Sequence, residues 1–213
     1  MRRLHSAGWL TLLVLTALAG STAANSQGEA AEAEPAQART MQVLIAYHSL
    51  YGSTERFAQG VAEGVKEVPG AVAVVKRVEE VSKEDLVAAD AIALGCPTYF
   101  GNIPGKIKIV IDDWNWKWKV DFTDKVGGAF ATGAGQVGGK EHVVLSLLIF
   151  MIHNRMVVAG PLYQDAEGED IWAESGAAAM TGPLDPGVSD DELDAARRLG
   201  ERLARLAAKL QGD

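Results

Sequence analysis

Hydrophobic residues form two kinds of pattern along the chain, unbroken apolar runs and a three-to-four spacing, and both appear in the stretch 43–68. The apolar run Val43 to Ala46 is typical of a strand that is buried on both faces of a parallel sheet. A polar loop follows at 49–54, and behind it apolar residues recur at the three-to-four spacing of an amphipathic helix. These helical positions are Phe57, Ala58, Val61, Ala62, Val65 and Val68. The stretch therefore predicts a strand, a short loop and a helix.

The same alternation continues toward the C-terminus and predicts five strands joined by helices. The expected strands are 43–46, 71–78, 91–95, 126–131 and 156–159. The expected helices are 57–68, 82–88, 103–113, 141–153 and a final helix from the Ser189–Glu192 capping box to Leu210. The segments expected to be loops include 96–102, the tryptophan-rich 114–118, the glycine-rich 132–139 and the long irregular 160–187. This order predicts a doubly wound α/β sheet, which binds ligands at the carboxyl ends of its strands.

The loop at 49–54 has the composition of an anion site. The first N–H groups of a helix have no partners within the helix, and the helix dipole favours negative charge there. Ser49, Ser53 and Thr54 add hydroxyl groups, and the loop contains no Lys or Arg. It suits a phosphate monoester, and it lacks the Gly-Lys-Ser/Thr ending of a nucleotide triphosphatase loop. An ordinary capped turn is the alternative.

The N-terminal 40 residues differ from the rest of the chain. Arg2 and Arg3 precede an apolar stretch at 9–19, which is short for a bilayer span, and small residues follow at 21–24. The predicted parts are a signal peptide at 1–24, a disordered linker at 25–40 and a domain at 41–213. The protein is then expected to be exported, to the periplasm, without stable membrane insertion after leader cleavage. An uncleaved anchor is one alternative, and a cytoplasmic protein that starts at Met41 is another.

Composition narrows the range of partners. The chain has 213 residues, of which 48% are hydrophobic, and this suits one globular domain. The 28 acidic residues outnumber the 20 basic ones, and the net charge of −8 argues against nucleic acid and anionic membranes as partners. The single cysteine, Cys96, excludes an internal disulfide. The histidines show no metal-binding spacing, so no metal site is expected.

Three loop sequences resemble the FMN-contacting loops of flavodoxin-like proteins. They are Ser49-Leu-Tyr-Gly-Ser-Thr54, Cys96-Pro-Thr-Tyr-Phe-Gly-Asn102 and Ala131-Thr-Gly-Ala-Gly-Gln136. Together with Val61-Ala-Glu-Gly64 and Val75-Lys-Arg-Val78, they are most similar to the WrbA type of NAD(P)H:quinone oxidoreductase. The resemblance covers about 41–210. It implies a flavodoxin-like, doubly wound five-stranded parallel sheet in three α/β/α layers.

The resemblance also implies a set of site residues. The implied cofactor-binding residues are Ser49, Leu50, Tyr51, Gly52, Ser53, Thr54, Pro97, Thr98, Tyr99, Phe100, Gly101, Asn102, Ala131, Thr132, Gly133, Ala134, Gly135 and Gln136. Tyr51 and Trp118 are candidates for contact with the substrate, with ordinary packing as the alternative. No catalytic residue stands out, and His153 is the one candidate for the pocket, with a structural histidine as the alternative.

The sequence departs from that family in several places. The family's His-His-Gly-Met stretch appears here as His153-Asn154-Arg155-Met156, and the insertion after the second strand is shortened to 79–83. The resemblance alone implies a homodimer or homotetramer, and the shortening would affect any tetramer contacts that lie in this insertion. The stretch 133–138 also satisfies the Gly-x-Gly-x-x-Gly fingerprint, but no acid lies about 20 residues further on. We therefore interpret it as a flavin-flanking loop.

The resulting hypothesis is an FMN-dependent oxidoreductase that passes electrons from NAD(P)H to a quinone-type acceptor. Bound flavin carries this chemistry, so no protein acid or base is required. A flavodoxin-type electron carrier without an enzymatic substrate is one alternative. An exported flavodoxin-like binding module that has lost the flavin is the other.

Overall fold

The computed structural model describes residues 40–135, 138–161, 176–181 and 187–212. The signal peptide and the linker predicted at 1–40 lie almost wholly outside the described residues, and both stay predictions. Within the described ranges, no helix combines the length and the apolar character that a membrane crossing requires.

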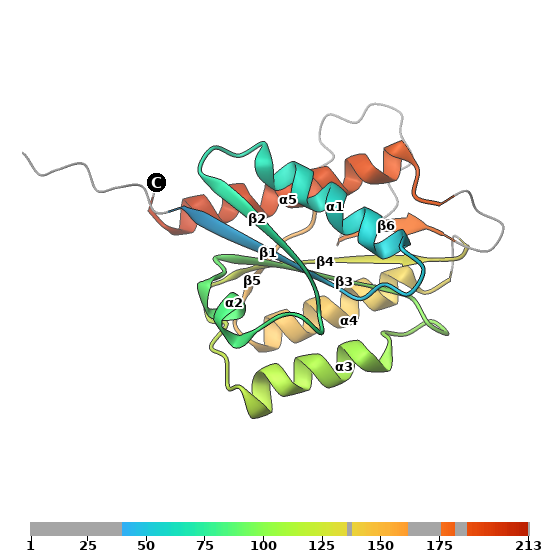
Figure 1. Cartoon of the computed structure of the whole chain (residues 1–213), viewed down its shortest axis with the longest axis horizontal. Coiled ribbons are helices and arrows are strands. Elements are labelled where there is room, and N and C mark those ends of the chain that lie inside the picture. The colour runs from blue at the N-terminus through green and yellow to red at the C-terminus, as the bar shows by residue number, and fades with distance from the viewer. Residues whose placement is uncertain (1–39, 136–137, 162–175, 182–186, 213) are drawn as a thin grey trace, which may run out of the picture. The chain divides into compact units, whose positions relative to one another are not determined.

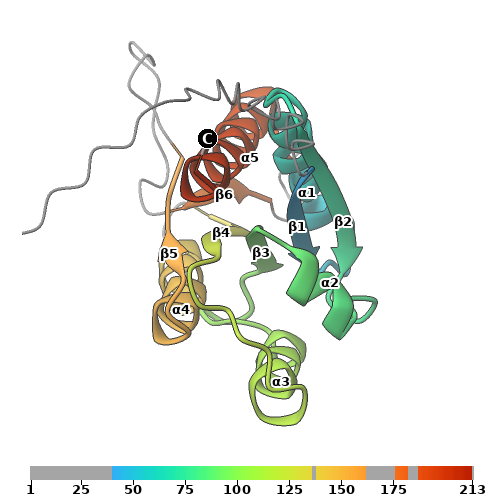
Figure 2. The same ribbon diagram turned by 90° about the vertical axis from the view of Figure 1, so that its left-hand side faces the viewer.

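A parallel sheet forms the centre of the described domain, with the strand order β2-β1-β3-β4-β5 (Figure 1). Its strands are β1 (Met41–Tyr47), β2 (Ala71–Arg77), β3 (Ala91–Pro97), β4 (Val126–Gly133), β5 (Val157–Val158) and β6 (Ala177–Met180). The last two strands share one side of β4. β5 pairs with the start of β4 and β6 pairs with its end, so two short strands together occupy the fifth position of the sheet (Figure 2).

Helices cover both faces of this sheet, as the alternation of patterns predicts (Figure 1). They are α1 (Ser53–Lys66), α2 (Lys83–Ala88), α3 (Gly105–Asp112), η1 (Asp113–Lys117), α4 (Lys140–His153) and α5 (Asp190–Leu210). α1 and α5 pack on one face, and α3 and α4 pack on the other. The doubly wound three-layer sheet is therefore confirmed.

β1 explains the unbroken apolar run in the sequence. Successive side chains of a strand point to opposite faces, so Val43 and Ile45 enter the core under α1 and α5. Leu44 and Ala46 enter the second core, under α3 and α4. Because both faces of β1 are covered, every position in the run has to be apolar.

The tryptophan-rich segment was expected to be a loop, and this expectation was wrong. α3 continues directly into one π-helical turn, η1, where the N–H of Trp118 donates to the carbonyl of Asp113 at 2.9 Å. Trp114 is buried against Phe122 and Phe150, and its burial anchors the extra turn. The sequence pattern did not show that the helix continues here, because three of the five residues at 114–118 are tryptophans, which were expected to form a loop.

Two loop boundaries also differ from expectation. β4 runs to Gly133, so Thr132 and Gly133 belong to a strand and not to the glycine-rich loop. The segment 160–187 was expected to be irregular throughout, but it contains β6. The start of β6 has room only for small residues, because Ala129 and Val144 lie close to it. A Cβ on Gly176 would lie 2.5 Å from both the carbonyl oxygen of Ala129 and a methyl carbon of Val144.

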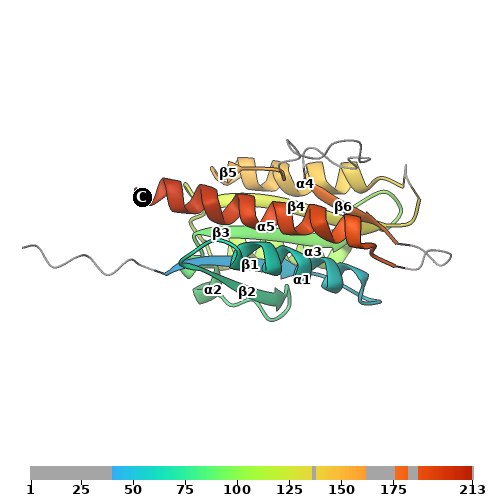
Figure 3. The same cartoon turned by 90° about the horizontal axis from the view of Figure 1, so that it is seen from above.

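α1 and α5 lie side by side on their face of the sheet, and two glycines allow their close approach (Figure 3). A Cβ on Gly64 would overlap the carbonyl oxygen of Arg197, and a Cβ on Gly200 would overlap the carbonyl oxygen of Val61. Backbone therefore meets backbone at this crossing. The contact fixes the position of α1, whose N-terminus reaches the carboxyl edge of the sheet.

We expect Gly64→Ala and Gly200→Ala each to lower the free energy of unfolding by about 2–3 kcal/mol, because the added methyl forces the helices apart. Urea unfolding followed by circular dichroism measures this change. Gly105→Ala is the matched control, since no atom lies within 4 Å of its added Cβ. The control should be neutral or stabilising by up to about 1 kcal/mol. Equal behaviour of the three variants would contradict a backbone contact between α1 and α5.

Candidate functional site

A cavity of about 690 Å³ opens at the carboxyl ends of β1, β3 and β4. Its size lies within the range of small-molecule sites, roughly 300–1,000 Å³. The described residues that line it are all uncharged: Ser49, Leu50, Tyr51, Ser53, Thr54, Pro97, Thr98, Tyr99, Thr132, Gly133, Ala134, Thr181 and Gly187. The cavity lies where the three glycine- and hydroxyl-rich loops meet, as the sheet topology predicts.

The first loop presents the N-terminus of α1 to this cavity. Gly52 is the N-cap residue with φ at +95°, and no side chain caps the helix. That backbone favours glycine, and it lets the Gly52 N–H donate to Ser49 Oγ at 3.1 Å. Because the N-terminal amides of α1 have no side-chain cap, they are available to an anion in the cavity.

A hydroxyl pair connects the first loop with the third. Thr54 Oγ1 lies 2.7 Å from Thr132 Oγ1, and both side chains are buried. Thr54 belongs to the first turn of α1 and Thr132 to the end of β4. The hydrogen bond therefore links the N-terminus of α1 to the end of β4 at the lining of the cavity.

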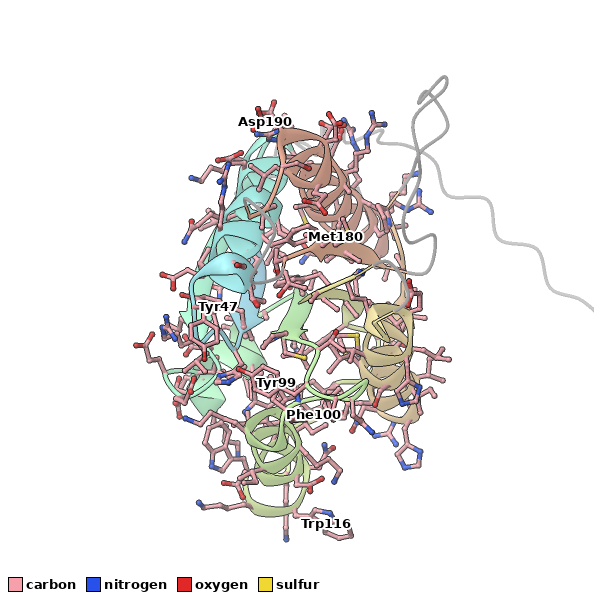
Figure 4. The ribbon with its side chains drawn as sticks, turned by 90° about the vertical axis from the view of Figure 1, so that its right-hand side faces the viewer. Tyr47, Tyr99, Phe100, Trp116, Met180 and Asp190 are labelled. Atoms are coloured by element: carbon pink, nitrogen blue, oxygen red, sulfur yellow. The ribbon has the colours of Figure 1, made fainter. Side chains whose placement is uncertain are left out.

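The second loop makes a tight turn from Tyr99 to Asn102. The N–H of each residue donates to the carbonyl of the other, at 2.9 and 3.0 Å. Phe100 and Gly101 between them have φ values of +53° and +75°, which define a hairpin turn of the primed type. For Phe100 this backbone costs about 1–2 kcal/mol, and the fully exposed ring stands next to Tyr99 (Figure 4). The strained backbone of this turn holds the Phe100 ring beside the cavity.

Two polar atoms of the cavity lining have no hydrogen-bond partner within the described part of the chain. They are Thr98 Oγ1 and the Tyr99 hydroxyl, and both are buried. Buried polar groups in proteins are nearly always satisfied, so these two atoms indicate a ligand. Burial raises the pKa of Tyr99 above its ordinary value, so its hydroxyl stays protonated at neutral pH and can donate. An anion site together with separate donors for a polar ring fits a flavin mononucleotide.

A cation that the sequence reasoning missed lies beside the third loop. Lys140, the first residue of α4, is only 4% exposed, and its Nζ donates to the Gly135 carbonyl at 2.6 Å. Its side chain passes close to Gly133, where an added Cβ would lie 3.3 Å from Lys140 Cγ and 3.0 Å from Thr98 Cβ. In the sequence, Lys140 is only a polar residue at a helix start, and nothing marks it as buried.

The structure brings together most of the implied cofactor-binding residues. Eleven of them line the cavity: Ser49, Leu50, Tyr51, Ser53, Thr54, Pro97, Thr98, Tyr99, Thr132, Gly133 and Ala134. Gly52, Phe100, Gly101, Asn102, Ala131 and Gly135 lie in the same loops or at the adjoining strand end without lining the cavity. Gln136 lies outside the described residues. Thr181 and Gly187 also line the cavity, and the sequence reasoning missed them because they follow the unexpected strand β6.

Trp118 and His153 lie away from the cavity. α3 and α4 start near the carboxyl edge of the sheet and run back to the opposite edge (Figure 1). Trp118 follows η1 there and packs against the core under α3 and α4, while His153 ends α4 and is exposed. The structure therefore does not place either residue beside a ligand in this cavity, although Tyr51 does line it.

His48 lies behind the second loop, in a cluster of charged groups. Its ring meets the ring of Tyr99 edge-on, with centroids 6.4 Å apart. Its Nδ1 is 3.5 Å from Glu79 Oε1, too long for a good hydrogen bond, and Lys106 Nζ lies 2.9 Å from the same oxygen. Burial lowers the pKa of His48, although the Glu79 carboxylate opposes this shift. The imidazole is therefore held neutral beside Tyr99.

We expect the protein to lose stability as the pH falls through the range in which His48 titrates. The unfolded chain takes up a proton near the ordinary histidine pKa of about 6.5, whereas the folded protein does so at lower pH. The unfolded state thus binds more protons in that range, and the free energy of unfolding decreases below about pH 6.5. Thermal unfolding from about pH 8 to pH 5 should show a shallower decline for His48→Asn. Identical slopes would refute the assignment to His48.

Comparisons with known proteins agree with this geometry. The family model described as NADPH-dependent FMN reductase matches residues 14–169. A protein of Geobacter sulfurreducens named NAD(P)H dehydrogenase (quinone) is 35% identical, over 81% of this chain and 100% of its own length. A protein of Geotalea uraniireducens with the same name is 34% identical, over 80% of this chain and 99% of its own.

Solved structures show the same fold. The flavodoxin, WrbA-like protein of Agrobacterium tumefaciens superimposes with a TM-score of 0.63 at 26% identity, over 79% of this chain and 98% of its own. An archaeal flavodoxin superimposes with a TM-score of 0.60 at 19% identity, over 79% of this chain and 99% of its own. The flavodoxin-like fold expected from the loop sequences is confirmed.

Proposed function

The chain belongs to the NADPH-dependent FMN reductase family, and we propose that it uses bound FMN to pass electrons from NAD(P)H to a quinone. The observation that carries this proposal is the uncapped N-terminus of α1, which opens into a cavity whose described lining residues are all uncharged. A phosphate monoester can bind there through amides and hydroxyls without a basic side chain in the cavity. The names of the curated relatives support the donor and the acceptor.

Each of the three loops has a part in holding the cofactor. Ser49, Ser53, Thr54 and the α1 amides would bind the phosphate. Thr98 and Tyr99 would supply donors to polar atoms of the ring system, since both have unused hydroxyls. The chemistry that bound FMN supplies is acceptance of a hydride and release of two electrons. The chain itself has to position the two substrates and exclude water.

Aromatic side chains at the mouth of the cavity suit flat substrates. Tyr51 and Phe100 are almost fully exposed, and they belong to two different loops, the first and the second. The flat faces of aromatic rings stack favourably on other flat rings. Nicotinamide and quinone rings are both planar, so stacking against these side chains would hold either one in turn.

FMN binding to the purified full-length chain tests the cofactor site, and we expect Gly52→Asp to lose it. The substitution places a carboxylate where the phosphate would bind and forces a left-handed backbone on a non-glycine residue. Gly70→Asp is the matched control, because Gly70 also has a positive φ and open space but lies at the opposite end of α1. Quenching of flavin fluorescence should show tight binding to wild type and Gly70→Asp, and at least about 100-fold weaker binding to Gly52→Asp.

The same preparations distinguish an enzyme from an electron carrier. Anaerobic addition of NADPH or NADH should bleach the flavin absorbance of the loaded protein, and a quinone should restore it. A loaded protein that no reduced nicotinamide bleaches would contradict the oxidoreductase and favour the flavodoxin-type carrier. A wild-type chain that binds no FMN would exclude both functions.

We also propose that the chain forms a homodimer through α4. Leu145, Ile149 and Ile152 form one stripe along this helix, and each is more than half exposed. Apolar side chains at this spacing on an outward helix face favour burial against a partner. We propose a second copy of this chain as the partner, because the family resemblance implies a homo-oligomer.

We expect Ile149→Glu to convert the dimer to a monomer, because it would bury a charge in the shared apolar surface. Light scattering coupled to gel filtration measures the mass. Val87→Glu is the control, since Val87 has similar exposure on α2, away from the stripe. A wild-type chain that is monomeric at high micromolar concentration would overturn this proposal.

A further inference from the structure

Arg77 ends β2 and lies behind the first loop, outside the set of residues that line the cavity. Its Nη1 donates to the carbonyl of Ser49 at 2.8 Å, and its Nη2 donates to Glu55 Oε2 at 2.7 Å. The guanidinium carbon also lies 5.6 Å from the centroid of the Tyr47 ring. A single side chain therefore joins the end of β1, the start of the loop and the first turn of α1.

These contacts fix the loop from the side that faces away from the ligand. Ser49 makes two different hydrogen bonds: its Oγ accepts from the Gly52 N–H on the inside, and its carbonyl accepts from Arg77 on the outside. Glu55 holds the other end of the loop through the same guanidinium. The fork of an arginine suits this role, because its N–H groups have a fixed mutual geometry.

The charges in this contact bear directly on anion binding. Glu55 is the acidic residue of the first turn of α1, where a carboxylate and a bound phosphate compete for the same positive helix end. The described cavity lining contains no basic residue that would offset it. Arg77 Nη2 lies 2.7 Å from Glu55 Oε2, so a compensating positive charge stands directly beside this carboxylate.

We propose that Arg77 is a positioning residue for the phosphate group of FMN, an inference that rests on the proposed function. It holds Ser49 and Glu55 in place and keeps the Glu55 carboxylate from repelling the phosphate. An ordinary surface ion pair would behave differently. Such a pair contributes little to stability and has no reason to distinguish a flavin that carries a phosphate from one that does not.

Comparison of FMN with riboflavin, which lacks the phosphate, tests the proposal. In Arg77→Gln we expect the dissociation constant of FMN to rise roughly tenfold, as removal of about 1–2 kcal/mol of anion stabilisation predicts, while that of riboflavin changes less than about threefold. Glu55→Gln combined with Arg77→Gln should regain about fivefold in FMN affinity over Arg77→Gln alone, because the uncompensated carboxylate is gone. Arg77→Lys should lie between wild type and Arg77→Gln, since it keeps the charge and loses the fork.

Arg56→Gln is the control for overall charge. Arg56 is adjacent to Glu55 in the same helical turn, is exposed and makes no side-chain contact with the loop among the described interactions. Its removal should change FMN affinity less than about threefold at moderate salt.

Three results would overturn the role of Arg77: equal loss of FMN and riboflavin binding in Arg77→Gln, no loss of either, or no recovery in the double variant. Riboflavin binding also reports whether each variant retains the cavity. A wild-type chain that binds neither flavin would instead contradict the proposed function.

Discussion

The burial of β1 on both faces is the constraint on which the rest of the structure depends. The side chains of Val43 and Ile45 are buried on one face of the sheet and that of Leu44 on the other, so helices have to pack on both faces. Once α1 turns back to supply the first cover, its N-terminus lies at the carboxyl end of β1. The close backbone contact between α1 and α5 then leaves that N-terminus little room to move. The position of the candidate anion site is therefore a consequence of how the core is covered.

Much of the fold and most of the site could be predicted because their signals are local in the sequence. The period of apolar residues identifies the strands and helices, and the topology of a doubly wound sheet places 49–54, 96–102 and 131–136 at one edge. Those three loops carry the resemblance to flavodoxin-like proteins, and their described residues supply most of the cavity lining. The Ser189 capping box also forms as predicted, because it needs only residues three positions apart.

The features that could not be predicted depend on where helices end and on contacts distant in sequence. Trp118 and His153 have the right chemistry for a flavin site, but Trp118 follows η1 and His153 ends α4, where these helices have already crossed back to the far edge of the sheet. β6 consists of three alanines and Met180, which carry no strand signal, and a parallel pairing with β4 determines its structure. Arg77 belongs to a stretch that carries the family resemblance, and Lys140 is only a charged residue near a helix start. Only the fold shows that Arg77 supports the first loop and that Lys140 is buried beside the third.

The division of the fifth sheet position between β5 and β6 has a consequence for how this fold can vary. Each of the two strands is registered separately against β4, one at Val126–Gly127 and the other at Phe130–Gly133. A change in the length of the connection between them would therefore shift neither register. The core under α5 and the wall of the cavity would both be preserved. The edge of the sheet thus contains an insertion point, where an evolving lineage can add or remove chain without rebuilding the domain.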